Sequence, residues 1–246
     1  MEKIFKESEN RAYRVIYKHL SSIYARIKSK SISESPQSAI QLLNIISQQS
    51  WADVIAKIYE TEGETFYLYQ KKRLNGKKDF NFSSGFFSEI WRAAMNRIMN
   101  NADMFIRIKN ITDLTRNDIR KVLQVAIDNR YGARDIAKLM SEQTGYIRRR
   151  SLRIARTEVT YAASLGKEQA ANESTLPLLK VWVHGGGRTD PRQNHAALHK
   201  TKVKKNELFD MGNGKAMKYP GDPMGGAGET VNCTCSIVYI VDENNI

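Results

Sequence analysis

The residues with the most specific chemistry are two histidines and two cysteines in the last quarter of the chain. His195 and His199 are four residues apart, so on a helix both would face the same way. Cys233 and Cys235 are two residues apart, so on a strand their side chains would share one face. Imidazole and thiolate are ligands that zinc takes in tetrahedral sites. The four residues therefore form a candidate zinc site; the alternative is a packed core in which free thiols act as small apolar groups.

The same region offers two weaker routes to catalysis. Cys233 or Cys235 could act as a nucleophile with His195 as its base, but a cysteine on a strand, away from a helix N-terminus, is usually inert. Asp190 and Glu158 could form an acid/base pair, although pairs of carboxylates are too common to indicate one. We therefore assign no catalytic residue and expect a protein that is not an enzyme and has no cofactor other than the possible zinc.

A helix expected from about Tyr146 to Ala171 carries an acid on its apolar side. At 100° per residue, one broad face collects Ser151, Ile154, Ala155, Val159, Ala162, Leu165 and Gly166. The small residues among them would let another backbone approach closely. Glu158 lies inside this arc without a basic residue four positions before or after it, and a buried carboxylate is costly unless a partner satisfies it. We expect Arg192 to be that partner, since a guanidinium can bind a carboxylate through two hydrogen bonds.

The charge of the chain favours an anionic partner. The 246 residues carry a net charge of +13, for which nucleic acid is the leading explanation and a membrane surface the second. Cationic side chains lie outside the apolar arc of the same helix, at Arg148, Arg149, Arg150, Arg153 and Arg156. They are the best candidates for contact with the phosphates of double-stranded DNA, without sequence preference, and a basic stretch at 71–78 is a second candidate.

Two further features bear on location. No apolar run approaches the ~20 residues that a membrane-spanning helix needs. Of the two anionic partners we therefore expect DNA and no membrane. Two cysteines at Cys-x-Cys spacing do not form a disulfide framework, which fits a protein that resides or assembles in a reducing cytoplasm.

The elements that would position these residues are mostly helical. Apolar residues at steps of three and four predict a helix over about 2–28, and Ser/Thr-x-x-Asp patterns predict helix starts at Ser50 and Thr115. Short strands are expected near 179–184 and 235–241. The fold class is therefore α+β, with a helical N-terminal domain at 1–112 and a small α+β domain with a short antiparallel sheet at 113–246.

Five motifs in a fixed order resemble the phage Mu F-like minor head proteins, also called head-morphogenesis proteins. They are Arg153-Ile-Ala-Arg-Thr-Glu158, a strand with Trp182, Asp190-Pro-Arg192-x-x-His195, Tyr219-Pro-Gly-Asp-Pro223, and Asn232-Cys-Thr-Cys235. The resemblance covers about Thr115 to Tyr239. The chain departs from the family pattern at Lys200, where glycine is usual, and at Thr234, where arginine is usual.

The resemblance implies a low-copy structural component of a tailed-phage head, located near the portal in the head interior with the DNA, and assembled in the host cytoplasm. It does not imply an established enzyme. The motif residues would then serve the structure of the domain: Glu158, Trp182, Asp190, Arg192, His195, Tyr219, Pro220 and Asn232. Two alternatives stay open: a nucleic-acid-acting or toxin-like enzyme that uses His195 and Arg192, and a host-encoded DNA-binding module with no virion.

Overall fold

Helices make up the first part of the chain, and the strands follow them in the sequence. A computed structural model describes residues 1–76, 84–185 and 191–245. The first part contains α1 (Glu2–Ser33), α2 (Pro36–Gln41), α3 (Gln48–Ile58), α4 (Glu64–Leu74), α5 (Ser84–Met99), α6 (Ala102–Asp128), α7 (Ala133–Glu142) and α8 (Thr144–Asn172), with a 3-10 turn at Leu42–Ile45 and a π-helical turn, η2, at Tyr59–Gly63. Among the described residues, no helix is both long and apolar enough to cross a bilayer.

A small α+β unit follows α8. It contains β1 (Leu178–Val183), α9 (Gln193–Ala197), β2 (Lys202–Lys204), β3 (Phe209–Asp210), β4 (Ala216–Met217), a 3-10 turn η3 (Pro223–Gly225), α10 (Gly226–Thr230), β5 (Ser236–Val241) and a last turn at Glu243–Asn245. Strand β1 lies between β2 and β5 and pairs antiparallel with both. The expected α+β class, with two of these strands near 179–184 and 235–241, is confirmed.

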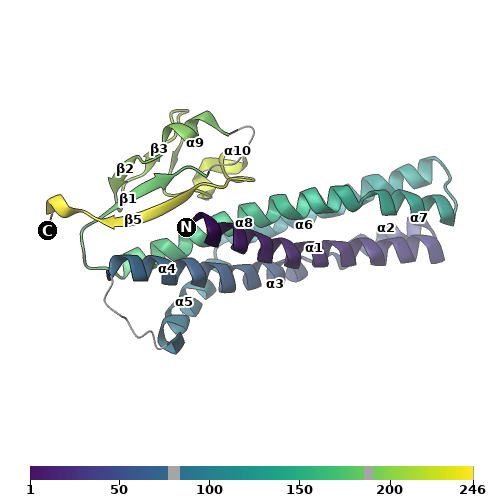
Figure 1. The fold of residues 1–246 in the computed structure, drawn as a ribbon. Coiled ribbons are helices and arrows are strands. Elements are labelled where there is room, and N and C mark those ends of the chain that lie inside the picture. The colour runs from purple at the N-terminus through teal and green to yellow at the C-terminus, as the bar shows by residue number, and fades with distance from the viewer. Residues whose placement is uncertain (77–83, 186–190, 246) are drawn as a thin grey trace.

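The bundle is elongated, and the α+β unit lies over one end of it. Figure 1 shows α1 and α8 running along the long axis, with α7 at the far end and the N-terminus close to β5. The apolar stripe expected on the first helix faces the core, because Ile16, Leu20 and Ile27 are buried. Buried residues of both parts belong to one continuous apolar cluster, so the small sheet packs on the bundle without a separate core of its own.

Both helix starts predicted from capping patterns are wrong. Helix α3 begins earlier than Ser50, because the Ser47 side chain accepts the bond from the Ser50 N–H. Thr115 lies in the middle of α6, where its hydroxyl donates to the Ile111 carbonyl at 2.7 Å. Helix α6 thus runs unbroken across residues 112 and 113, and the division of the chain into domains at that point stays a prediction.

Helix α8 approaches a neighbouring backbone as closely as its small residues predict. A Cβ added at Gly166 would lie 2.2 Å from the Gly63 carbonyl oxygen and 3.0 Å from the Tyr67 nitrogen. Backbone cannot move aside as the end of a flexible side chain can. The junction between η2 and α4 therefore requires glycine at this position of α8.

We expect Gly166→Ala to destabilise the protein, because the added methyl group would force α8 away from Gly63; overpacking of this kind costs about 1–3 kcal/mol. The matched control is Gly145→Ala, which is also in α8 but would meet only the end of the Arg149 side chain, at 3.5 Å. That control should be neutral or slightly stabilising, since alanine is the better helix former. Thermal unfolding measures both, and equal midpoints for the two variants would contradict the close approach.

Candidate metal centre

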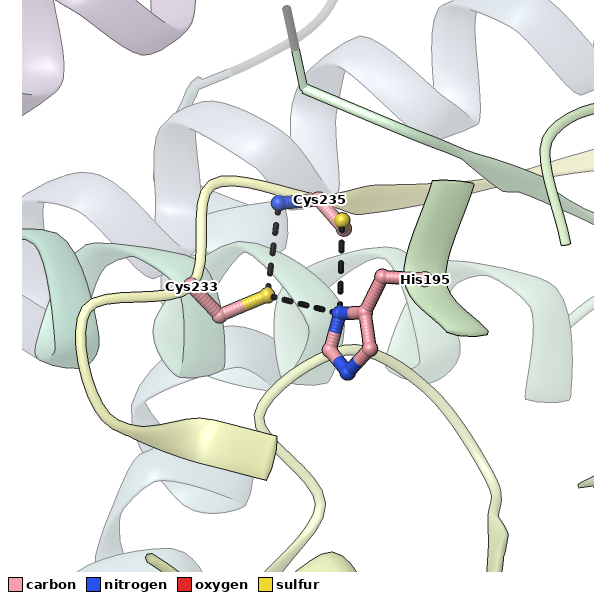
Figure 2. Close-up of side chains that lie close together, drawn as sticks. All are labelled: His195, Cys233 and Cys235. Carbon is pink, nitrogen blue, oxygen red and sulfur yellow. Dashed lines mark hydrogen bonds between the residues drawn. The ribbon is translucent and has the colours of Figure 1, made fainter. Parts of the chain in front are cut away.

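Three of the four candidate zinc ligands meet at one point. His195 comes from α9, and Cys233 and Cys235 come from the segment just before β5. Figure 2 shows the His195 ring directed at both sulfurs: its Nδ1 lies 3.5 Å from the Cys233 Sγ and 3.6 Å from the Cys235 Sγ. All three side chains are buried, with exposed fractions of 2%, 1% and 3%. Their ligand atoms all lie within 4.8 Å of one another.

The fourth candidate, His199, does not join them, and the expected set of two histidines and two cysteines is wrong in this respect. Helix α9 ends at Ala197, so the spacing rule for a helix does not reach His199. Its ring is exposed, and its Nδ1 accepts the backbone N–H of His184 at 3.2 Å. Across the described ranges, the trio of His195, Cys233 and Cys235 gains no further histidine, cysteine or carboxylate as a fourth member.

A carboxylate fixes the other side of the His195 ring. Glu229, in α10, places its Oε2 2.8 Å from the His195 Nε2. Asn194 and Asn213 donate to the same carboxylate at 3.2 and 2.8 Å. Burial acts to raise the pKa of Glu229, but these bonds outweigh it and the pKa is lowered, so the group is ionised. An ionised acceptor at Nε2 favours the proton on that nitrogen and leaves Nδ1 with a lone pair toward the sulfurs.

The two thiols do not release their protons independently. A hydrogen bond from Cys233 is the largest cause that lowers the pKa of Cys235; burial opposes it, while His195 and the Gly185 backbone N–H lower it further. The same bond, followed by burial, raises the pKa of Cys233. The contact between the two side chains therefore shifts their pKa values in opposite directions.

The walls of this centre are closely packed. The Trp182 ring, fully buried in β1, meets the His195 ring edge-on at 5.3 Å between centroids. Gly185 lies against the turn between the cysteines, where an added Cβ would be 2.1 Å from the Thr234 carbonyl oxygen. The Cys235 N–H donates to the Cys233 Sγ at 3.4 Å, which holds the two sulfurs on the same side.

Helix α8 holds the cysteine segment through a row of polar side chains, of which only Thr157 lies in a quoted sequence motif. The Thr157 hydroxyl accepts the Asn232 N–H at 2.8 Å, and the Thr160 hydroxyl donates to the Cys233 carbonyl at 2.6 Å. One turn further along, Ser164 donates to the Pro220 carbonyl at 2.8 Å. Steps of three and four place these hydroxyls on one face of α8, and that spacing is the signal that could have revealed them.

The same row ends in a buried lysine. Lys167 is fully buried and donates to the Ser236 hydroxyl, at the start of β5, at 2.5 Å. Burial, followed by the charge of Arg73, lowers the pKa of Lys167 to about 7. The sheet is therefore tied to α8 at its edge as well as through the segment that carries the cysteines.

Glu158 is buried as expected, but its partner is Arg107 of α6 and not Arg192. The Arg107 guanidinium lies 2.9 Å from the Glu158 Oε1, and the Tyr59 hydroxyl donates to Oε2 at 2.9 Å. Burial acts to lower the pKa of Arg107, yet the Glu158 carboxylate holds it above its usual value. The Arg192 guanidinium instead donates to the Val231 carbonyl at 2.8 Å. The predicted Glu158–Arg192 pair is wrong.

The comparisons with known proteins point to the region that carries this centre. Residues 117–238 match the family model described as "Phage Mu protein F like protein". This region of the chain is therefore similar to the phage Mu F-like proteins. Among curated proteins, "Uncharacterized protein YqbB" of Bacillus subtilis (strain 168) is 32% identical over 130 residues, which is 52% of this chain and 43% of the relative. The match thus spans less than half the length of that relative. No solved structure matches significantly.

The remaining residues of the Mu F-like motifs support the backbone around the centre. Tyr219 and Pro220 are buried beside α8. Asn232 adopts the left-handed conformation, with φ 58°, directly before Cys233. Asp190 lies outside the described residues. The Mu F-like pattern has glycine at the position of Lys200, and this lysine has φ 68°, so the turn keeps the backbone that glycine adopts most easily.

We expect Glu158→Ala to cost about 3–5 kcal/mol of unfolding free energy, because it leaves the Arg107 charge buried without its partner. Arg107→Ala should destabilise the protein by a comparable amount, because it leaves the buried Glu158 carboxylate without its cation. Arg192→Ala is the control and should cost clearly less. Chemical denaturation of the three variants measures this, and a larger loss for Arg192→Ala than for Arg107→Ala would restore the pairing expected from the sequence.

Proposed function

We propose that this protein is a minor head protein of a tailed phage or prophage, which lies near the portal in the head interior and contacts the packaged DNA without sequence preference. The observation that carries the proposal is the match of residues 117–238 to the phage Mu F-like family. The order of motifs in that region, which resembles the head-morphogenesis proteins, supports it further.

The geometry of the motif residues favours a structural role over catalysis. His195 has an exposed fraction of 2% and contacts Glu229 and two sulfurs, so both ring nitrogens are engaged within the protein. Arg192 donates to the Val231 carbonyl. A catalyst needs such groups to converge on an open cleft where substrate can reach them. These contacts support a domain whose polar residues serve its own stability.

Head incorporation is the direct test. In particles purified from the phage or induced prophage that encodes it, mass spectrometry should detect the protein, protected from added protease until the heads are opened. Chemical cross-linking of intact particles should join it to the portal protein. A soluble protein from the same replicon, such as a lysis enzyme, serves as the control and should be absent. Recovery of this protein only in the lysate, outside particles, would contradict the proposal.

The proposed DNA contact uses fewer arginines than the sequence suggested. Arg148, Arg149 and Arg153 are exposed on α8. Arg150 instead bonds to the Thr115 hydroxyl at 3.0 Å, with 13% of its side chain exposed, and Arg156 pairs with Glu9 at 3.5 Å. Of the second candidate stretch, Lys71 pairs with Glu173, and Lys77 and Lys78 lie outside the described residues.

We expect the triple charge reversal of Arg148, Arg149 and Arg153 to glutamate to weaken binding to random double-stranded DNA. The slope of log K against the logarithm of the salt concentration should also become shallower by about 2–3. This corresponds to roughly 0.9 for each phosphate that the variant no longer neutralises. The matched control reverses Lys200, Lys202 and Lys204, which are exposed in the α+β unit. Fluorescence anisotropy over a salt series measures both. Equal reductions in affinity for the two variants would show that net charge, and not this face of α8, carries the binding.

A further inference from the structure

The distances around His195 match those between the ligands of a bound metal ion. Zinc bonds of about 2.0–2.1 Å to nitrogen and about 2.3 Å to sulfur, at the tetrahedral angle, set nitrogen and sulfur about 3.6 Å apart. The Nδ1 of His195 lies 3.5 and 3.6 Å from the two sulfurs. Both nitrogen–sulfur distances therefore match a shared ion, and the three ligand atoms all lie within 4.8 Å of one another.

The surroundings also match those of a metal ligand. A histidine that binds zinc almost always donates its second ring N–H to a carboxylate or carbonyl, which fixes the tautomer. Glu229 supplies that carboxylate at 2.8 Å, and it is itself held by two asparagines. Nδ1 of His195 is the shared contact of both sulfurs, as expected for three atoms that bind one ion. A metal ion satisfies all three ligand atoms at once.

We propose that His195, Cys233 and Cys235 bind one zinc ion, with Glu229 as the carboxylate that orients His195 and with a buried water molecule as the fourth ligand. Two thiolates and one imidazole select zinc over magnesium or calcium, which prefer oxygen. The ion would link α9 to the segment before β5. His199 takes no part, because its ring is exposed and bonded to the His184 backbone.

The full chain, purified without chelator from cells grown with added zinc, should contain about one zinc per molecule by elemental analysis. Cobalt added to the chelator-treated protein should give the intense absorption of thiolate-bound tetrahedral cobalt. Chelator should lower the thermal midpoint, and added zinc should restore it. A protein without zinc, whose midpoint responds to neither chelator nor zinc, would overturn the proposal.

Variants assign the ligands. Cys233→Ser with Cys235→Ser should lose the zinc, whereas His199→Ala, the matched histidine control, should keep it. Glu229→Gln leaves all three ligands in place and should weaken zinc binding about 10- to 100-fold in a chelator competition. If the double cysteine variant does not fold, the cobalt spectrum of the wild type and the Glu229→Gln competition decide. Zinc retained at full affinity in either the double cysteine variant or Glu229→Gln, or absent from His199→Ala, would contradict the assignment.

Discussion

From Ile154 onward, most of α8 is buried between the other helices and the α+β unit, so the polar groups there need partners from other elements. Toward the bundle, Glu158 is met by Arg107 and Tyr59. Toward the α+β unit, the hydroxyls of Thr157 and Thr160 bond the backbone beside Cys233. The absence of a side chain at Gly166 lets the bundle close around the same helix. Contacts with α8 therefore hold the cysteine segment in place without a bound metal.

Periodicity predicted the first helix and α8 because it reports burial, which largely determines where a helix forms. Capping patterns failed because a serine or threonine hydroxyl can form its local hydrogen bond either at a helix start or inside a helix. Thr115 resembles a helix start, yet its hydroxyl bonds the carbonyl four residues before it, a bond available in the interior of any helix. In α3 the true cap, Ser47, stands three residues before the predicted one. At Thr115, the packing of α6 along the bundle determines that the helix continues through this residue.

The sequence predicted the parts of the candidate site that depend on local spacing, but not those that depend on contacts between distant segments. Spacing brought Cys233 and Cys235 together correctly, since two residues on one short segment must lie close. It failed for His199 because α9 ends before that residue. The need of Glu158 for a cation followed from its place on an apolar face, but its partner, Arg107, stands 51 residues earlier on a different helix. A sequence can indicate that a buried charge needs a partner, while three-dimensional packing selects which one.

This arrangement bears on what a bound zinc ion would do. In a zinc finger the ligands are gathered only when metal binds, so the free energy of binding is largely the free energy of folding. Here Cys233 is already held by Thr160, and His195 by Trp182 and Glu229. The surrounding core is continuous with that of the bundle. A metal would therefore meet ligands arranged in advance, and its removal should loosen α9 and the segment before β5 while α1 and α8 remain folded.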